Sequence, residues 1–405
     1  MFIKKSMITI ALSLFVLSGC QQSSGTTSGT ANSTDSPQAE STAAAQPTTP
    51  ASTATATPTP DTRTGSGTAS ELPSKAPMSP VTAARLADAK QGWIGGKGWI
   101  AHTSDGGAKW QIQYEGAGDV KQLFALNGQD AWAVVGDDAK LLGTTDGGKH
   151  WAAVGKVPNA GFLHFVTKQE GFSGNAMTVD GGKSWTSLPV PDGITGKVAY
   201  FHDKANGWGV KQVGDTIQVE RTKDGGKTWH AVMARKTVAP PTDAVIRSAG
   251  ANDAWIELIG DSGMTQTSYS LFHTSNGGKD WQTVLANSTA GGGPAPGVPD
   301  GDTQAHKNNG SKPGPLYVVS PEVAFMGGQC PACDKPNTLG WTKDGGKTWV
   351  NGKESFTGFG DMLLAMADAN QGWLITNDNS QPSVMYTTAT GGDGWKKVHT
   401  FDAPK

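Results

Sequence analysis

The 405-residue sequence has few cysteines, almost no net charge and no long apolar run after its first twenty residues. Three cysteines are present, and the formal net charge is −2. A chain this close to neutral lacks the basic footprint of a nucleic-acid-binding protein or of one that adheres to an anionic membrane surface. No later apolar run is long enough to cross a bilayer. We therefore expect partners other than nucleic acid, and membrane contact only through the N-terminus.

The N-terminus has the parts of an export signal. Lys4 and Lys5 precede an apolar stretch from Met7 to Leu17, which ends in Leu17-Ser18-Gly19-Cys20. This ending resembles a bacterial lipobox, in which cleavage leaves a cysteine for acylation. We expect residues 1–19 to be a lipoprotein signal peptide and Cys20 to be lipidated. The protein would then be extracytoplasmic and anchored to the bacterial cell membrane. The alternative is an ordinary secretory peptide with a chance cysteine.

Residues 20–80 contain little besides Ser, Thr, Ala, Gly, Pro and Gln after the cysteine. Such a segment has too little apolar surface to offset the entropy of ordering a chain. We interpret it as a disordered linker. As a coil of about 60 residues its ends would lie roughly 40 to 45 Å apart, which suits a domain held away from a membrane.

Residues 81–405 contain an eight-residue pattern, Thr-x-Asp-Gly-Gly-x-x-Trp, seven times. We call it the repeat motif. The copies begin at Thr103, Thr144, Thr178, Thr222, Thr274, Thr342 and Thr388. The fifth copy has Asn276 in place of Asp, and the seventh has Thr390. The closing tryptophans lie 34 to 68 residues apart, which is the spacing of one four-stranded blade each. The sequence therefore predicts an all-β, seven-bladed β-propeller, with an insertion loop at about 287–315.

The residue types of the motif are those of a hairpin turn. An Asp or Asn side-chain oxygen can accept hydrogen bonds from the backbone N–H groups that follow it, and the two glycines allow positive φ. The tryptophan begins the next strand and buries a large apolar surface. We therefore assign structural roles to the motif residues Asp105, Asp146, Asp180, Asp224, Asn276 and Asp344.

A second aromatic column precedes the motifs. Its members are Trp93, Trp132, Phe172, Trp208, Trp255, Phe325 and Trp373. Eight positions before each of these stand Arg85, Phe124, His164, Tyr200, Arg247, Tyr317 and Ala365, flanked mostly by apolar residues. Alternation places this set on one face of the first strand of each unit. That face lines the central channel or packs between neighbouring blades. The candidate binding residues are Arg85, His164, Tyr200, Arg247 and Tyr317.

The seven motifs resemble the Asp-box, or bacterial neuraminidase repeat. Their Gly-Trp and Asp-Gly-Gly-Lys-x-Trp motifs are similar to those of the photosystem II assembly and stability factor propellers. The resemblance covers about 80 per cent of the chain. That family is widespread in bacteria without a photosystem, so the resemblance implies a propeller with a binding role more than photosynthesis. Sialidases, some glucanases and sortilin-type receptors share the box, and one fold hosts many functions.

The sequence contains no recognisable set of catalytic residues. A sialidase needs three arginines around the substrate carboxylate, and this chain has five in all, Arg63, Arg85, Arg221, Arg235 and Arg247, of which Arg63 lies in the linker. A glycosidase needs two carboxylic acids across a cleft. Candidate acids are Asp119, Glu170, Asp203, Glu257 and Asp361, each also explained as a solvated loop carboxylate. We assign no catalytic residue and no cofactor.

The leading hypothesis is a non-catalytic binding or assembly scaffold, monomeric and membrane-anchored, that presents a propeller face to a protein, peptide or glycan. The alternative is a glycoside hydrolase acting on polysaccharide or glycoconjugate.

A cysteine pair and an acidic pair lie in the sixth repeat unit. Cys330 and Cys333 form a Cys-Pro-Ala-Cys pair, for which we expect a disulfide that staples a loop. A thioredoxin-like role would place the pair at a helix start, and zinc would require two further ligands, with His306 the nearby histidine. Asp300 and Asp302 in the insertion are too few oxygen ligands to predict calcium, so we expect no metal.

Overall fold

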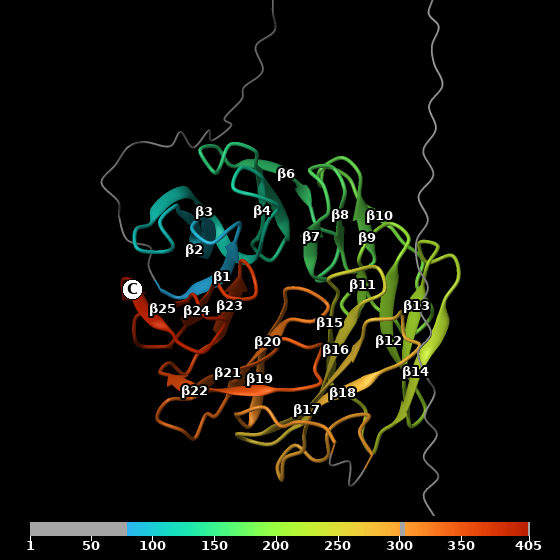
Figure 1. The fold of residues 1–405 in the computed structure, drawn as a ribbon. Helices are drawn as coiled ribbons and strands as arrows, with labels where there is room; N and C mark the ends of the chain where they lie inside the picture. The colour runs from blue at the N-terminus through green and yellow to red at the C-terminus, as the bar shows by residue number, and fades with distance from the viewer. Residues whose placement is uncertain (1–78, 300–303, 404–405) are drawn as a thin grey trace, which may run out of the picture. The chain divides into compact units, whose positions relative to one another are not determined.

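The computed structural model describes residues 79–299 and 304–403 (Figure 1). The chain divides into two units, Met1–Thr62 and Arg63–Lys405, and every described residue belongs to the second. The signal peptide, Cys20, nearly all of the linker and the Asp300-Gly301-Asp302 segment lie outside the described residues. Within the described part of the chain, no helix is long and apolar enough to cross a membrane.

The regular elements of the described residues are 26 strands in six sheets, with antiparallel hydrogen bonding between neighbours. Sheet I contains β1 (Val81–Leu86), β2 (Gly92–Thr103), β3 (Gln111–Ala125), β4 (Ala131–Val135), β5 (Lys140–Thr144) and β6 (Ala152–Lys156). Sheet II contains β7 (Leu163–Phe165), β8 (Gly171–Ser173), β9 (Ala176–Thr178) and β10 (Thr186–Ser187). Sheet III contains β11 (Ala199–Phe201), β12 (Gly207–Val213), β13 (Thr216–Thr222) and β14 (His230–Lys236).

The remaining sheets follow the same order. Sheet IV contains β15 (Asp243–Arg247), β16 (Ala254–Ser262), β17 (Thr267–Thr274) and β18 (Gln282–Asn287). Sheet V contains β19 (Lys312–Val318), β20 (Ala324–Gln329), β21 (Asn337–Thr342) and β22 (Val350–Phe356). Sheet VI contains β23 (Met362–Met366), β24 (Gly372–Thr376), β25 (Val384–Thr388) and β26 (Lys396–Thr400). The sheets stand side by side in a ring, and the prediction of an all-β propeller with four-stranded blades is confirmed in sheets II to VI.

The predicted blade number of seven is wrong, because the structure has six blades. The difference arises in β3, which runs without a break from Gln111 to Ala125. Its first part pairs with β2, up to Asp119 opposite Lys97, and its last part pairs with β4 from Val120 onward. The first two repeat units therefore share one six-stranded sheet.

The repeat motifs close tight turns between the third and fourth strands of the four-stranded sheets and at the matching positions of sheet I. In the motif at Thr342, the Thr342 hydroxyl donates to Asp344 Oδ1 at 2.8 Å and accepts the N–H of Gly346 at 2.8 Å. Asp344 Oδ1 also accepts the N–H of Thr348 at 2.9 Å. Both glycines of all seven motifs have positive φ, between 67° and 99°. The turn is therefore a closed hydrogen-bonded unit that glycine makes sterically possible.

The second aromatic column forms the interior of the sheets. Trp93, Trp208, Trp255, Phe172 and Phe325 are fully buried, as are Trp132 and Trp373 to within a few per cent. Burial of these large side chains supplies much of the apolar contact inside and between sheets.

The side chains of an arginine and a histidine link some neighbouring sheets. Arg221 lies over the ring of Trp208 at 4.9 Å and donates to the carbonyl of Gly277, in the next repeat motif, at 2.8 Å. His273 stacks on Trp255 at 3.9 Å and contacts the carbonyl of Gly345 in the following motif at 2.8 Å. These residues connect one aromatic column to the adjacent turn, a role that the sequence did not indicate.

The ring closes between β1 and the loop after β24. The Asn377 side chain accepts the N–H of Val81 at 3.1 Å and donates to the carbonyl of Val81 at 2.8 Å. The N–H of Ser79 donates to the carbonyl of Asp402 at 2.9 Å. Because β1 belongs to sheet I and β26 to sheet VI, the ring closes through these contacts and not through a strand shared by the two ends.

Candidate functional site

The candidate binding residues sit on the first strands of the repeat units, and the strand register matches the eight-residue offset found in the sequence. The pairs are Arg85 with Trp93, Phe124 with Trp132, His164 with Phe172, Tyr200 with Trp208, Arg247 with Trp255, Tyr317 with Phe325 and Ala365 with Trp373. The offset recurs because each first hairpin has the same length. Each polar or aromatic residue is thus set directly opposite a buried ring.

All five candidate binding residues line one cavity of about 330 Å³. Phe124, Phe162 and His202 also line it. A second cavity of about 360 Å³ shares Phe162, Tyr200 and Arg247 with the first, and extends to Lys121, Lys197 and Asp243. We call the two cavities together the channel. Its walls come from β3 and from the first strands of all six sheets, which are β1, β7, β11, β15, β19 and β23.

Two arginines provide the positive charge of the channel. The guanidinium of Arg247 lies 3.9 Å from the centre of the Phe162 ring and donates to the carbonyl of Ile246 at 2.8 Å. The guanidinium of Arg85 lies 4.9 Å from the Phe124 ring and 5.4 Å from the Tyr317 ring. Aromatic faces attract such cations without neutralising them. Within the described residues, neither arginine forms an ion pair with a carboxylate.

The carboxylates near Arg247 leave its charge largely uncompensated. Burial raises the pKa of Glu257 to about 8, although the charge of Arg247 opposes the shift, so Glu257 is mostly protonated at neutral pH. Burial lowers the pKa of Arg247 to about 10, which still leaves it charged. Asp243, at the other cavity, is paired with Lys197 at 2.6 Å. The channel therefore favours an anionic guest.

His164 is a buried polar group of the channel whose ring nitrogens are not hydrogen-bonded to described residues. It is only 7% exposed, and its ring stacks on Tyr200 with centres 4.9 Å apart and planes 7° apart. Among the residues that the structure describes, neither ring nitrogen has a hydrogen-bond partner. Burial, with a smaller contribution from His202, lowers the pKa of His164 to about 3. The neutral ring therefore offers one donor and one acceptor to a guest.

The tyrosines both line the channel and connect neighbouring sheets. The Tyr200 hydroxyl donates to the carbonyl of Ser248 at 3.1 Å, and the Tyr317 hydroxyl donates to the carbonyl of Met366 at 2.9 Å. The two alternatives for this column, channel lining and packing between blades, thus both describe these residues. Phe162 and His202 were missed by the sequence analysis. Each stands two positions from a candidate, so extending the alternation along the strand would have found them.

The channel has few of the side chains that catalysis or metal binding would require. Asp243 lines the second cavity, no carboxylate is among the lining residues of the first, and Glu257 is 2% exposed and lines neither. Among the residues that the structure describes, no group of three or more His, Cys, Asp or Glu side chains is placed to hold a metal ion.

One family model and several solved structures are similar to this chain. A family model described as Photosynthesis system II assembly factor YCF48 matches residues 69–161. The fold is similar to a structure titled "YCF48 bound to D1 peptide", with 18% identity over 82% of this chain and 97% of that chain and a TM-score of 0.45. It is also similar to a GH74 enzyme of Niastella koreensis, with 14% identity over 80% of this chain and 66% of that one and a TM-score of 0.37.

A third similar structure is the SapL1 lectin in complex with alpha methyl fucoside, with 11% identity over 81% of this chain and 98% of that chain and a TM-score of 0.39. No curated protein matches the sequence. The resemblance to the assembly factors was expected over residues 81–405, and the family model detects it over 69–161. That region contains β1 to β6, the whole of the six-stranded sheet.

Proposed function

We propose that the protein is a non-catalytic binding propeller whose channel holds a peptide segment carrying an acidic group. The observation that carries the proposal is the pair of arginines without carboxylate partners, Arg85 and Arg247, in one cavity with the unpartnered ring of His164. A carboxylate in this cavity would gain charge-assisted hydrogen bonds in surroundings shielded from water. The family match over residues 69–161 supports a binding role of the assembly-factor kind, and we assign the repeat motifs to the Asp-box.

The size and charge of the channel favour a peptide over a glycan. A cavity of about 330 Å³ is at the lower end of the range for small-ligand pockets, so it suits one or two side chains or a chain end. Neutral sugars would leave the arginines unpaired. Lys121 and Lys197 line the second cavity, but both are paired with carboxylates, Lys121 with Asp119 at 3.7 Å and Asp137 at 3.3 Å and Lys197 with Asp243 at 2.6 Å. The uncompensated charge therefore comes from the arginines.

An array of peptides from bacterial envelope proteins tests this function. Each acidic peptide is paired with a version in which Asp and Glu are replaced by Asn and Gln. We expect the protein to retain acidic peptides and to lose them in the amide versions. Equal retention of both versions would show that charge does not govern binding.

A glycan and chromogenic-substrate panel tests the hydrolase alternative. Turnover of any substrate that Asp243→Asn abolishes would replace the binding proposal with catalysis, because Asp243 is the carboxylate at the channel wall. The binding proposal expects no turnover above that of the Asp243→Asn variant.

We further propose that Cys20 anchors the protein to the outer side of the bacterial cell membrane. The support is the sequence around Leu17-Ser18-Gly19-Cys20. Labelled palmitate should enter the wild-type protein and the Ser24→Ala control, and Cys20→Ser should abolish the label and release the protein from the membrane fraction. A Cys20→Ser protein that keeps the label would contradict the proposal.

A further inference from the structure

A disulfide closes the tip of the hairpin formed by β20 and β21. Cys330 and Cys333 are three positions apart, with Cα atoms 5.4 Å apart. Cys333 is exposed and Cys330 is half-buried at the end of β20. The hairpin is also closed by its backbone, because the N–H of Cys330 donates to the carbonyl of Pro336 at 2.7 Å and Gln329 pairs with Asn337.

This disulfide contributes little as a staple. A ring of four residues restricts the unfolded chain far less than a long loop does. The backbone hydrogen bonds already hold the two strands together at this end. An exposed disulfide that is not required to hold its hairpin is chemically available to thiols.

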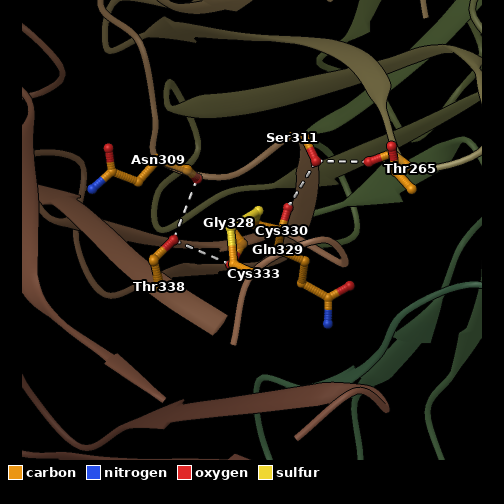
Figure 2. The surroundings of a disulfide bond; sticks show 8 residues. All are labelled: Thr265, Asn309, Ser311, Gly328, Gln329, Cys330, Cys333 and Thr338. Carbon is orange, nitrogen blue, oxygen red and sulfur yellow. Dashed lines mark hydrogen bonds between the residues drawn. A yellow bond between two sulfur atoms is a disulfide. The ribbon is translucent and has the colours of Figure 1, made fainter. Parts of the chain in front are cut away.

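The disulfide lies on a polar groove of about 890 Å³. Figure 2 shows both sulfur atoms beside Gly328 and Gln329, with Ser311 and Thr338 nearby. The groove is lined mainly by amide and hydroxyl side chains, among them Gln266, Asn287, Ser288, Asn309, Thr338 and Ser355. Such a surface can hydrogen-bond an extended peptide. It shares no lining residue with the channel.

The far wall of the groove is fixed in place. The Ser311 hydroxyl donates to the carbonyl of Thr265 at 2.7 Å, and the Thr338 hydroxyl contacts the carbonyls of Asn309 at 3.3 Å and Gly328 at 3.2 Å (Figure 2). The Ser311 hydroxyl thus ties the exit of the insertion to the loop between β16 and β17. The contact of Thr338 with Asn309, and the Ser311 N–H that donates to the carbonyl of Gln329 at 2.7 Å, tie it to the hairpin that carries the disulfide. The groove and the disulfide therefore form one surface.

We propose that the Cys330–Cys333 disulfide is a thiol–disulfide exchange site, and that the groove receives a cysteine-containing peptide segment of a partner protein. The partner thiolate attacks Sγ of Cys333, the more exposed of the two residues. A bond forms between the two, the Cys330–Cys333 bond breaks, and Cys330 leaves as a thiolate that takes a proton from water. Lys335, which lines the groove beside Asp334, supplies positive charge near the entering thiolate.

The fate of the mixed disulfide depends on the partner. Attack by the Cys330 thiolate on Cys333 restores the original bond and releases the partner unchanged. A partner with a second thiol instead attacks its own sulfur in the mixed disulfide. The partner is then oxidised by two electrons to a disulfide, and Cys330 and Cys333 are left reduced.

The test uses the full chain with Cys20→Ser, which leaves these two cysteines as the sulfur nucleophiles. The oxidised protein is mixed with reduced glutathione as the probe, quenched with acid, alkylated and mapped by mass spectrometry. We expect glutathione on Cys333 at least about ten times as often as on Cys330, with Cys330 alkylated in the same molecules. Adducts mainly on Cys330, or exchange more than about a hundredfold slower than with free cystine, would overturn the proposal.

Two further variants separate the groove from the sulfur chemistry. Lys335→Gln should slow exchange with the anionic glutathione about threefold and leave reduction by dithiothreitol unchanged. Lys396→Gln, at an exposed lysine of β26 outside the groove, is the control and should change neither rate. Equal effects of the two lysine variants would remove the groove from the proposal.

The thermal stability of the Cys330→Ser, Cys333→Ser double variant decides between exchange and stapling. The proposal expects a midpoint within a few degrees of that of the oxidised protein. A large fall would show that the bond is held for stability and would contradict the inference.

Discussion

At the scale of single residues, the repeat motif works through a side-chain oxygen that accepts backbone N–H groups. Asn276 performs this role in the fifth motif, where its Oδ1 accepts the N–H of Asp280 at 3.0 Å. In the seventh motif, Thr390 contacts Thr388 at 3.3 Å instead. Asn276 therefore shows that the negative charge is not required. The seventh turn closes through the Thr388 hydroxyl, which accepts the N–H groups of Thr390 at 3.2 Å and Gly392 at 3.3 Å. This part of the fold could be predicted from the sequence because the two partners of each hydrogen bond are at most four positions apart.

Replacing Asp344 tests the motif turn. Asp344→Ala removes the acceptor of three hydrogen bonds and should lower the free energy of unfolding by about 1 to 2 kcal/mol. Asp344→Asn should lie close to wild type, as Asn276 suggests. Urea unfolding measures both. A variant with asparagine as unstable as the one with alanine would show that the charge is required.

The pH dependence of one motif follows from Asp224. The Thr228 side chain, with its backbone N–H, donates to Asp224 and lowers its pKa from 3.8 to about 2. A lowered pKa in the folded state means that the stabilisation is complete above pH 3.8 and is lost as the pH falls toward 2. Thr228→Val should therefore destabilise the protein more at pH 7 than at pH 2.5, by urea midpoint. An equal loss of stability at pH 7 and at pH 2.5 would show that the ionised Asp224 carboxylate is not what Thr228 stabilises.

At the scale of elements, the sequence predicts the strands and their register better than their grouping into sheets. The eight-residue offset between Arg85 and Trp93, or between Arg247 and Trp255, is local to a hairpin and was readable. Whether a chain turns or continues between two units is set by packing around it. β3 continues through Gly116 and Gly118, which no sequence pattern indicated, and this reduces seven expected blades to six.

One side-chain amide, that of Asn377, makes two of the hydrogen bonds that close the ring. Asn377 is 5% exposed and bonds both backbone groups of Val81. Asn377→Ala would leave these buried groups poorly satisfied, with the Ser383 hydroxyl at 3.4 Å as a remaining contact for the N–H. We expect the free energy of unfolding to fall by about 2 to 4 kcal/mol. The backbone amides of β1 should also exchange hydrogen faster. The exposed Asn379→Ala is the control and should exchange like wild type.

At the scale of the whole molecule, the ring gathers residues that are 162 positions apart, Arg85 and Arg247, around one cavity. The sequence predicted which residues share a face, because strand alternation is regular. The absence of a carboxylate partner for these arginines could not be predicted, since it depends on where Glu257 and Asp243 fold. The same holds for the contact of Phe162 with Arg247, which joins two sheets.

The central claim is that the channel binds an acidic peptide through its arginines. The most direct measurement is a calorimetric titration of one acidic peptide from the array against wild type, Arg85→Ala/Arg247→Ala and Arg235→Ala, the last at an arginine of β14 outside the channel. We predict that the double variant weakens binding at least tenfold and that Arg235→Ala leaves the dissociation constant unchanged. An unchanged dissociation constant in the double variant, or an equal loss in Arg235→Ala, would contradict the claim.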